Sequence, residues 1–118
     1  MPGISVHVVD VSRGLPARGM QVEVTRIEPG GRTRAGGGTV GDGGLLDDAA
    51  LGRGDGVTAG LYEIELATGA WYREQGVAVG TPAFQEAIVY RFGISDPTAH
   101  IHLPIKLSPY GISVWRGA

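Results

Sequence analysis

The sequence predicts an all-β fold, a two-sheet sandwich of seven to eight strands with one short helix. Short stretches of alternating apolar and polar residues recur along the 118 residues, and turn-forming residues separate them. The chain has 21 glycines, and they cluster between Pro29 and Gly60, where they favour turns over helix. Hydrophobic residues make up 42% of the chain and charged residues 19%, so we expect residues 1–118 to form a single domain with one core.

The first two strands are predicted on either side of a turn. Alternation over Ile4–Val11 places Ile4, Val6 and Val8 on one face of the strand. The opposite face carries Ser5, His7 and Val9. The residues Arg13–Pro16 have turn chemistry. A second alternating strand is expected over Met20–Ile27.

The middle of the chain contains fewer regular signals. The glycine-rich residues 28–44 are expected to hold one short strand near residues 39–40. Leu61–Leu66 alternates again and predicts a strand. One or two helical turns are predicted over Thr68–Gln75, with the first residue as the N-cap and Gly76 as the stop.

The last third of the chain has the strongest alternation. A long strand is predicted over Phe84–Phe92, and Asp96-Pro97 marks the turn that follows it. The chain then returns over His100–Leu107, turns at Ser108–Gly111 and ends in a strand over Ile112–Arg116.

The bulk properties argue against several classes of function. A net charge of −2 gives no electrostatic attraction to nucleic acid or anionic membrane. No apolar run reaches the roughly 18–20 residues that span a bilayer, and the first four residues lack the pattern of a signal peptide. The chain has no cysteine, which excludes disulfides and thiolate chemistry. We therefore expect a cytoplasmic protein.

The three histidines are the first candidates for chemistry. Alternation puts His100 and His102 on one strand face with Pro104 and Lys106, and Ser113, Trp115 and Gly117 share a face of the next strand. A His-x-His pair suits metal binding or acid–base work near neutral pH, and a zinc site with His7 is one alternative. The other interpretation is a solvent-exposed His100 and a partly buried structural His102. A Ser-His-Asp set from Ser5 or Ser113 with His7 and Asp10 lacks a nucleophile-elbow motif.

Lys106 is the only lysine, and it interrupts an otherwise apolar strand. One interpretation is a charge that protects an edge strand from aggregation. The other is a cation on the His102 face that holds an anionic or carbonyl group of a ligand.

Several segments of the chain have a distinctive sequence: Ile4–Asp10 followed by Arg13–Ala17, Gly60–Ile64 with Thr68–Tyr72, and His100–Ser113 followed by Trp115–Ala118. Together they resemble the transthyretin and 5-hydroxyisourate hydrolase family over almost the whole chain. The resemblance implies a transthyretin-like sandwich that assembles as a homotetramer, a dimer of dimers, around a central channel. In the hydrolases that channel holds the active sites, which open the ring of 5-hydroxyisourate in urate breakdown without a metal or organic cofactor.

The resemblance also implies site residues. His7 and His102 stand where the hydrolases keep two catalytic histidines, which could deprotonate water and hold or protonate the substrate. The expected substrate-binding residues come from the C-terminal motifs: Lys106, Ser113, Trp115, Arg116, Gly117, Ala118 and His100.

The chain departs from the hydrolase pattern at several positions. Asp42-Gly43-Gly44 stands where the hydrolases have Asp-Gly-Arg, so the substrate-holding arginine is absent. Ala118 replaces the terminal serine, and Trp115 replaces a tyrosine. Lys106 takes the place of a leucine, and we expect it to substitute partly for the arginine or to serve a different ligand.

Three functions follow from these features. The first is a 5-hydroxyisourate hydrolase. The second is a diverged enzyme of a specialised pathway that opens, dehydrates or cyclises another ring. The third is a protein that binds a small ligand without catalysis, which the two retained histidines disfavour. The expected partner of the enzyme is a small heterocyclic molecule, and that of the non-catalytic protein is an apolar or aromatic ligand.

Overall fold

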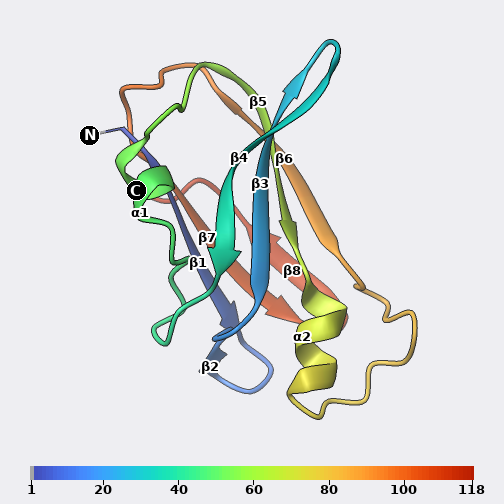
Figure 1. Cartoon of the computed structure of the whole chain (residues 1–118). Coiled ribbons are helices and arrows are strands. Elements are labelled where there is room, and N and C mark those ends of the chain that lie inside the picture. The colour runs from blue at the N-terminus through green and yellow to red at the C-terminus, as the bar shows by residue number, and fades with distance from the viewer. Residues whose placement is uncertain (1) are drawn as a thin grey trace.

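A computed structural model of the chain describes residues 2–118. Within this range it contains eight strands and two short helices (Figure 1). In chain order these are β1 (Ile4–Asp10), β2 (Leu15–Pro16), β3 (Gln21–Glu28), β4 (Gly31–Thr39), α1 (Ala49–Arg53), β5 (Gly60–Leu66), α2 (Thr68–Glu74), β6 (Ile88–Ile94), β7 (Ile101–Ser108) and β8 (Gly111–Val114).

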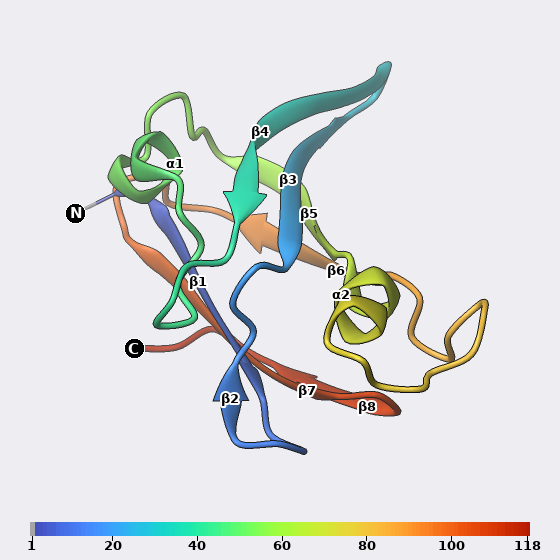
Figure 2. The same cartoon turned by 60° about the horizontal axis from the view of Figure 1, so that its bottom comes forward.

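The strands form two four-stranded sheets, ordered β2-β1-β7-β8 and β4-β3-β5-β6, which confirms the all-β sandwich. All pairs are antiparallel except β1 with β7, which run parallel in the middle of their sheet. The two sheets lie as separate layers, and the β3–β4 hairpin projects well beyond the sandwich (Figure 2). The parallel pair brings residues from the two ends of the chain into register, with Ser5 opposite His102 and His7 opposite Pro104.

The core fills the space between the two layers with side chains from the predicted inward faces. In β1 every second residue from Ile4 to Asp10 is buried, while those between are only partly covered. Because side chains alternate along a strand, burying one face fixes the opposite face toward solvent. The largest fully buried side chains come from both sheets, both helices and the residue before β3: Tyr62, Tyr72, Ile4, Met20, Leu51, Ile64, Leu66, Leu103, Ile105 and Leu107.

The glycine-rich segment is more regular than the sequence predicts. Instead of one short strand near residues 39–40, β4 pairs with β3 along its length. Gly37 and Gly38 have φ of 142° and 145°, which suits glycine alone, and a side chain at Gly37 would strike the β3 backbone. A register shift between Val24 and Thr25 accommodates the hairpin. Glycine here permits a closely paired edge strand.

The long strand predicted over Phe84–Phe92 is wrong in its first half. The strand β6 begins only at Ile88, and residues 80–87 turn instead. Phe84 is 76% exposed, and Glu86 turns aside to form an ion pair with Arg73 of α2. The alternation of residues 84–87 therefore reflects loop contacts and not a pleated strand.

Further differences concern the helices and one turn. The helix near residue 68 is confirmed, but its N-cap is Ala67, and the Thr68 hydroxyl donates to the Leu66 carbonyl. The sequence analysis missed α1, which Asp48 caps by accepting from the Leu51 N–H. Part of the predicted turn at 13–16 is instead the short strand β2. No helix among the described residues has the length and apolar character needed to cross a membrane.

Candidate active site

The polar side chains predicted to share a face lie together on the outer surface of the β2-β1-β7-β8 sheet. Neighbouring rows across β1, β7 and the segment that includes β8 are separated by two residues, or about 6.6 Å along the strands. The register gives three rows: Ser5–His102–Gly117, His7–Pro104–Trp115 and Val9–Lys106–Ser113. The sheet thus assembles one site from residues that are far apart in the sequence.

A serine lies between two of the histidines. Ser5 Oγ is 2.8 Å from Nε2 of His100 and 2.6 Å from Nδ1 of His102. The Nδ1 of His100 lies 3.2 Å from the Pro2 carbonyl oxygen. His100 is exposed and His102 is half-buried, so the pair reaches from solvent into the face of the sheet. The exposed His100 and the partly buried His102 agree with the structural interpretation, and the Ser5 hydroxyl connects the two rings.

His7 is held by the glycine turn that precedes α1. Its Nε2 donates to the Gly43 carbonyl oxygen at 2.9 Å, because a carbonyl can only accept. The residue next in the chain, Gly44, has φ of 94°, and a Cβ there would lie 2.9 Å from Nε2 of His7. The imidazole of His7 therefore fills the space that a side chain at position 44 would need. Sequence patterns gave no signal for this contact, since a backbone carbonyl makes it.

The electrostatics of the site keep His102 neutral. Burial lowers the pKa of His102 below its ordinary value of 6.5, and the nearby His100 and His7 lower it further. A neutral imidazole with one free nitrogen is a general base. At pH 7 His102 is therefore ready to accept a proton.

Lys106 lies one row beyond His7 on the same face. The strand β7 lies between β1 and β8, so Lys106 is not on an edge strand and the aggregation-blocking interpretation is wrong. Its Nζ lies 5.6 Å from the centroid of the Trp115 ring, a cation–π distance. Among residues 2–118 it forms no ion pair with a carboxylate.

Not all of the predicted C-terminal binding residues lie on the histidine face. Ser113 and Trp115 are exposed on the histidine face, and Gly117 packs so close to His102 that a Cβ would lie 2.9 Å from its ring. Arg116 lies between them in the alternation and acts instead on Asp96, whose pKa is lowered mainly by Thr98 and also by this arginine. Ala118 is exposed beyond these rows.

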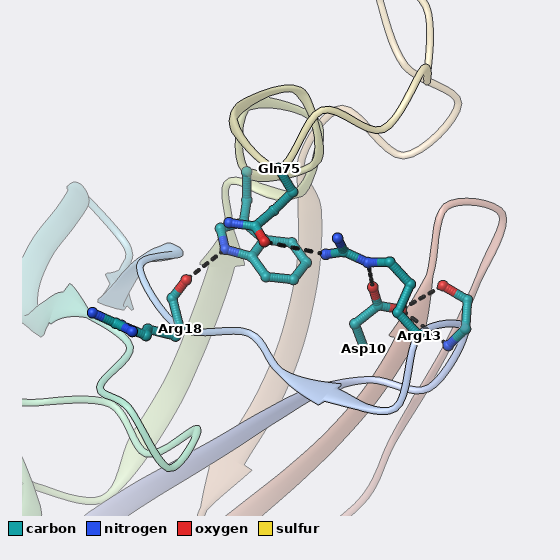
Figure 3. Close-up of polar contacts among 6 residues, drawn as sticks. Asp10, Arg13, Arg18 and Gln75 are labelled. Carbon is teal, nitrogen blue, oxygen red and sulfur yellow. Dashed lines mark hydrogen bonds and ion pairs between the residues drawn. The ribbon is translucent and has the colours of Figure 1, made fainter.

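The structure does not bring together a Ser-His-Asp triad. Asp10 is fully buried on the opposite face of β1 from Ser5 and His7. Its carboxylate accepts from the Ser12 N–H and hydroxyl and from Nε of Arg13 at 2.7 Å (Figure 3). Nor do three histidine or carboxylate side chains of residues 2–118 form a group that could hold a metal ion.

A cleft of about 360 Å³ lies near this aspartate and not at the histidines. Its lining comes from β2 and the segments around it: Leu15, Pro16, Arg18, Gly19, Asp42 and Gln75. Figure 3 shows Arg13 between Asp10 and Gln75 at this end of the molecule, with an Nη2 to Oε1 distance of 3.4 Å to the glutamine. These contacts connect elements of the fold.

The four arginines between residues 26 and 53 do not supply a cation to the histidine face. Each forms an ion pair elsewhere with a carboxylate: Arg26 with Glu28, Arg32 with Glu63, Arg34 with Glu23 and Arg53 with Asp55. Lys106 is therefore the cation that shares the face with His7 and His102.

Comparison with known proteins gives matches along nearly the whole chain. The sequence pattern of the HIUase/Transthyretin family matches residues 4–117. The 5-hydroxyisourate hydrolase 2 of Rhizobium meliloti is 36% identical over 115 residues, 98% of this chain and 95% of that protein. The structure of Klebsiella pneumoniae 5-hydroxyisourate hydrolase superposes with a TM-score of 0.78 at 28% identity, covering 100% of both chains. The crystal structure of (S)-allantoin synthase superposes with a TM-score of 0.87 at 30% identity, covering 98% of this chain but 43% of that protein.

Proposed function

The chain belongs to the HIUase/transthyretin family, and from this premise we propose that it is a hydrolase that adds water to 5-hydroxyisourate and opens its ring. Relatives that match nearly the full length carry the name 5-hydroxyisourate hydrolase, and one solved structure with that name matches over the full length. These names favour the hydrolase over a tailoring enzyme or a non-catalytic binding protein. The observation that carries the proposal is the pair His7 and His102 on neighbouring parallel strands.

The two imidazoles supply the proton transfers that this reaction needs. His7 and His102 are diagonal neighbours about 8 Å apart at the backbone, which leaves space between the rings for a water and a small planar substrate. His102 accepts a proton from the attacking water, whose oxygen bonds to a ring carbonyl carbon. The C–N bond then breaks and the nitrogen takes a proton. His7, whose Nε2–H is bonded to the Gly43 carbonyl, has a lone pair on Nδ1 that accepts a hydrogen bond from the attacking water or from a substrate N–H.

The remaining residues of the face complete the proposed substrate site. Lys106 and Trp115 lie beside His7, where a cation and an aromatic ring can hold an anionic planar ligand. The imidazoles perform the proton transfers, so the proposed reaction uses no cofactor. The histidine face of one chain is open, and we propose that a homotetramer closes it into a channel.

Hydrolysis of freshly generated 5-hydroxyisourate, followed by absorbance, tests the function. Wild type should accelerate ring opening, and His102→Ala should lose about 10²–10⁴-fold in kcat, the usual contribution of a general base. The rate of the wild type should fall with pH only below pH 6.5, because the pKa of His102 lies under that value and the neutral form is the base. A folded wild type that gives no acceleration would refute the proposal.

A further inference from the structure

The contacts of Ser5 determine which ring nitrogens of its two histidine neighbours carry hydrogen. The Pro2 carbonyl only accepts, so Nδ1 of His100 is the donor at 3.2 Å. In neutral His100 the other nitrogen, Nε2, has no hydrogen and accepts from the Ser5 hydroxyl at 2.8 Å. Ser5 has one hydrogen to give, so at 2.6 Å it accepts from Nδ1–H of His102. This leaves Nε2 of His102 with a free lone pair.

The same reasoning gives a second arrangement when His100 carries a positive charge. Both of its nitrogens then donate, and Nε2–H points at the oxygen of Ser5. The Ser5 hydroxyl hydrogen must turn to Nδ1 of His102, which becomes an acceptor, and the proton of neutral His102 moves to Nε2. The charge of His100 and the tautomer of His102 are thus coupled through one hydroxyl.

We propose that Ser5 and His100 form a proton relay that switches His102 between a base and an acid during ring opening. The inference rests on the proposed hydrolase function and deepens it, because it assigns His100 to proton transfer and adds Ser5 as a positioning residue. His100 is exposed, so a charge on it is stabilised by water, whereas a charge on half-buried His102 is not.

The proton balance of the cycle closes. The attacking water gives a proton to Nε2 of His102 as its oxygen bonds to the carbonyl carbon. The Nδ1 proton of His102 passes to Ser5 Oγ while the Ser5 hydroxyl proton passes to Nε2 of His100, which becomes the cation. His102 then donates Nε2–H to the ring nitrogen as the C–N bond breaks. Both relay protons return, and the starting arrangement is restored with no net gain or loss.

Among the groups around His102, the Ser5 hydroxyl is the one that also contacts His100. The neighbours of His102 across the strands are Ser5 on β1 and Gly117 in the C-terminal segment, and neither carries charge. The charged or titratable groups that face it are His7 on β1, Lys106 farther along β7, and His100 itself. His7 donates Nε2–H to the Gly43 carbonyl, so its neutral tautomer is the opposite of that of His102.

Nitrogen-15 NMR of the imidazoles tests the assignment without substrate. At pH 8 the wild type should show His102 with hydrogen on Nδ1 and His7 with hydrogen on Nε2, which serves as an internal reference. Ser5→Ala should abolish the preference of His102 and leave His7 unchanged, and Ser5→Thr, which retains a hydroxyl, should preserve both. Finding His102 with hydrogen on Nε2 in the wild type at this pH would overturn the relay, whatever the enzyme hydrolyses.

Kinetics test the relay in turnover. In dilute non-imidazole buffer, His100→Ala should lower kcat about tenfold to a hundredfold, and added imidazole should restore it in proportion to its concentration while leaving the wild type unaffected. Ser5→Ala should lose a similar factor and Ser5→Thr very little. Unchanged kcat in His100→Ala, or a loss that imidazole does not repair, would refute the relay. An inactive wild type would instead refute the proposed function, and the NMR tautomers would still decide the relay.

Discussion

At the scale of single residues, the glycine at position 44, where the resemblance to the hydrolases implies an arginine, and the position of His7 are one feature. The turn at Gly43 and Gly44 accepts the hydrogen bond of His7 and leaves no space for a side chain at Gly44. A residue with a Cβ at φ of 94° is also strained, at a cost of about 1 kcal/mol or more. An arginine at position 44 would therefore cost backbone strain and a displacement of the His7 ring.

The first prediction tests this exchange. Gly44→Arg should lower kcat/KM for 5-hydroxyisourate, because the new Cβ displaces the His7 ring from the Gly43 carbonyl. Gly43→Arg is the matched control, since nothing lies within 4 Å of a Cβ there and it adds the same charge one position earlier. Steady-state kinetics of both variants check the prediction, and an increase in kcat/KM for Gly44→Arg would contradict it.

Lys106 gives the second prediction at this scale. Lys106→Leu should lower kcat/KM about tenfold to a hundredfold, because the histidine face loses its cation while the strand keeps an apolar side chain. Lys106→Arg keeps the charge over Trp115 and should retain most of the activity. Circular dichroism establishes that both variants fold. Equal kinetics for Lys106→Leu and wild type would show that the lysine does not contact the substrate.

Residue patterns predicted part of this site. Alternation alone placed Ser5 and His7 together on one face of the first strand. It likewise placed His100, His102 and Lys106 together on one face of a later strand. The role of the Gly43 carbonyl could not be foreseen, because any residue has that group. The relation of Ser5 to His102 depends on the register of two strands that are distant in the sequence, which no local pattern encodes.

At the scale of elements, the end of β1 is attached to α2 through one buried carboxylate. Arg13 pairs with Asp10 and lies 5.3 Å from the Trp71 ring centroid of α2, while Nε1 of Trp71 donates to the Arg18 carbonyl. Burial alone would raise the pKa of Asp10, but the bonds from Ser12 and Arg13 outweigh it and hold the pKa below 3.8.

Asp10→Asn should therefore destabilise the protein by about 2–4 kcal/mol, since it leaves buried donors and Arg13 without their anion. Because the folded pKa is lowered, the contribution of Asp10 is complete above the ordinary value of 3.8 and declines as the pH falls through the lowered value. Urea unfolding at pH 7 measures the change. The control Asp42→Asn breaks an exposed pair with Arg18 and should leave the midpoint unchanged.

Elements were predicted well where side chains decide the structure and poorly where the backbone does. The alternation in β1, β3 and β5 matches their burial because one face of each packs in the core. The strand β4 escaped prediction because glycine residues pair through backbone groups and have no side-chain pattern. The helix α1 has five residues, and its signal lies mainly in the caps Asp48 and Gly54.

At the scale of the whole molecule, the proposed tetramer has a visible basis in the surface. Among the described residues the histidine-bearing sheet ends at β8, an unpaired edge, and carries exposed apolar side chains in β2, in its turns, in β8 and just after β8: Leu15, Val11, Tyr110, Ile112 and Trp115. An edge strand with apolar neighbours is suited to pairing with a second copy.

Sedimentation equilibrium should therefore give four times the chain mass of 12.3 kDa. Tyr110→Glu, at a ring that is 71% exposed in the single chain, should shift the mass to smaller species and lower the activity with it. Leu61→Glu adds the same charge on the other sheet and should leave the mass unchanged. A wild-type mass of one chain would refute the assembly.

The parallel pairing of β1 with β7 determines when during synthesis the site can form. During synthesis His7 leaves the ribosome long before His102 exists, and the strand that receives it is among the last to be made. Contacts so distant in sequence form slowly, since a long loop must close before they contribute. A nascent or truncated chain that lacks β7 has no histidine pair, so turnover of substrate would begin only after translation is complete and would report directly on finished molecules.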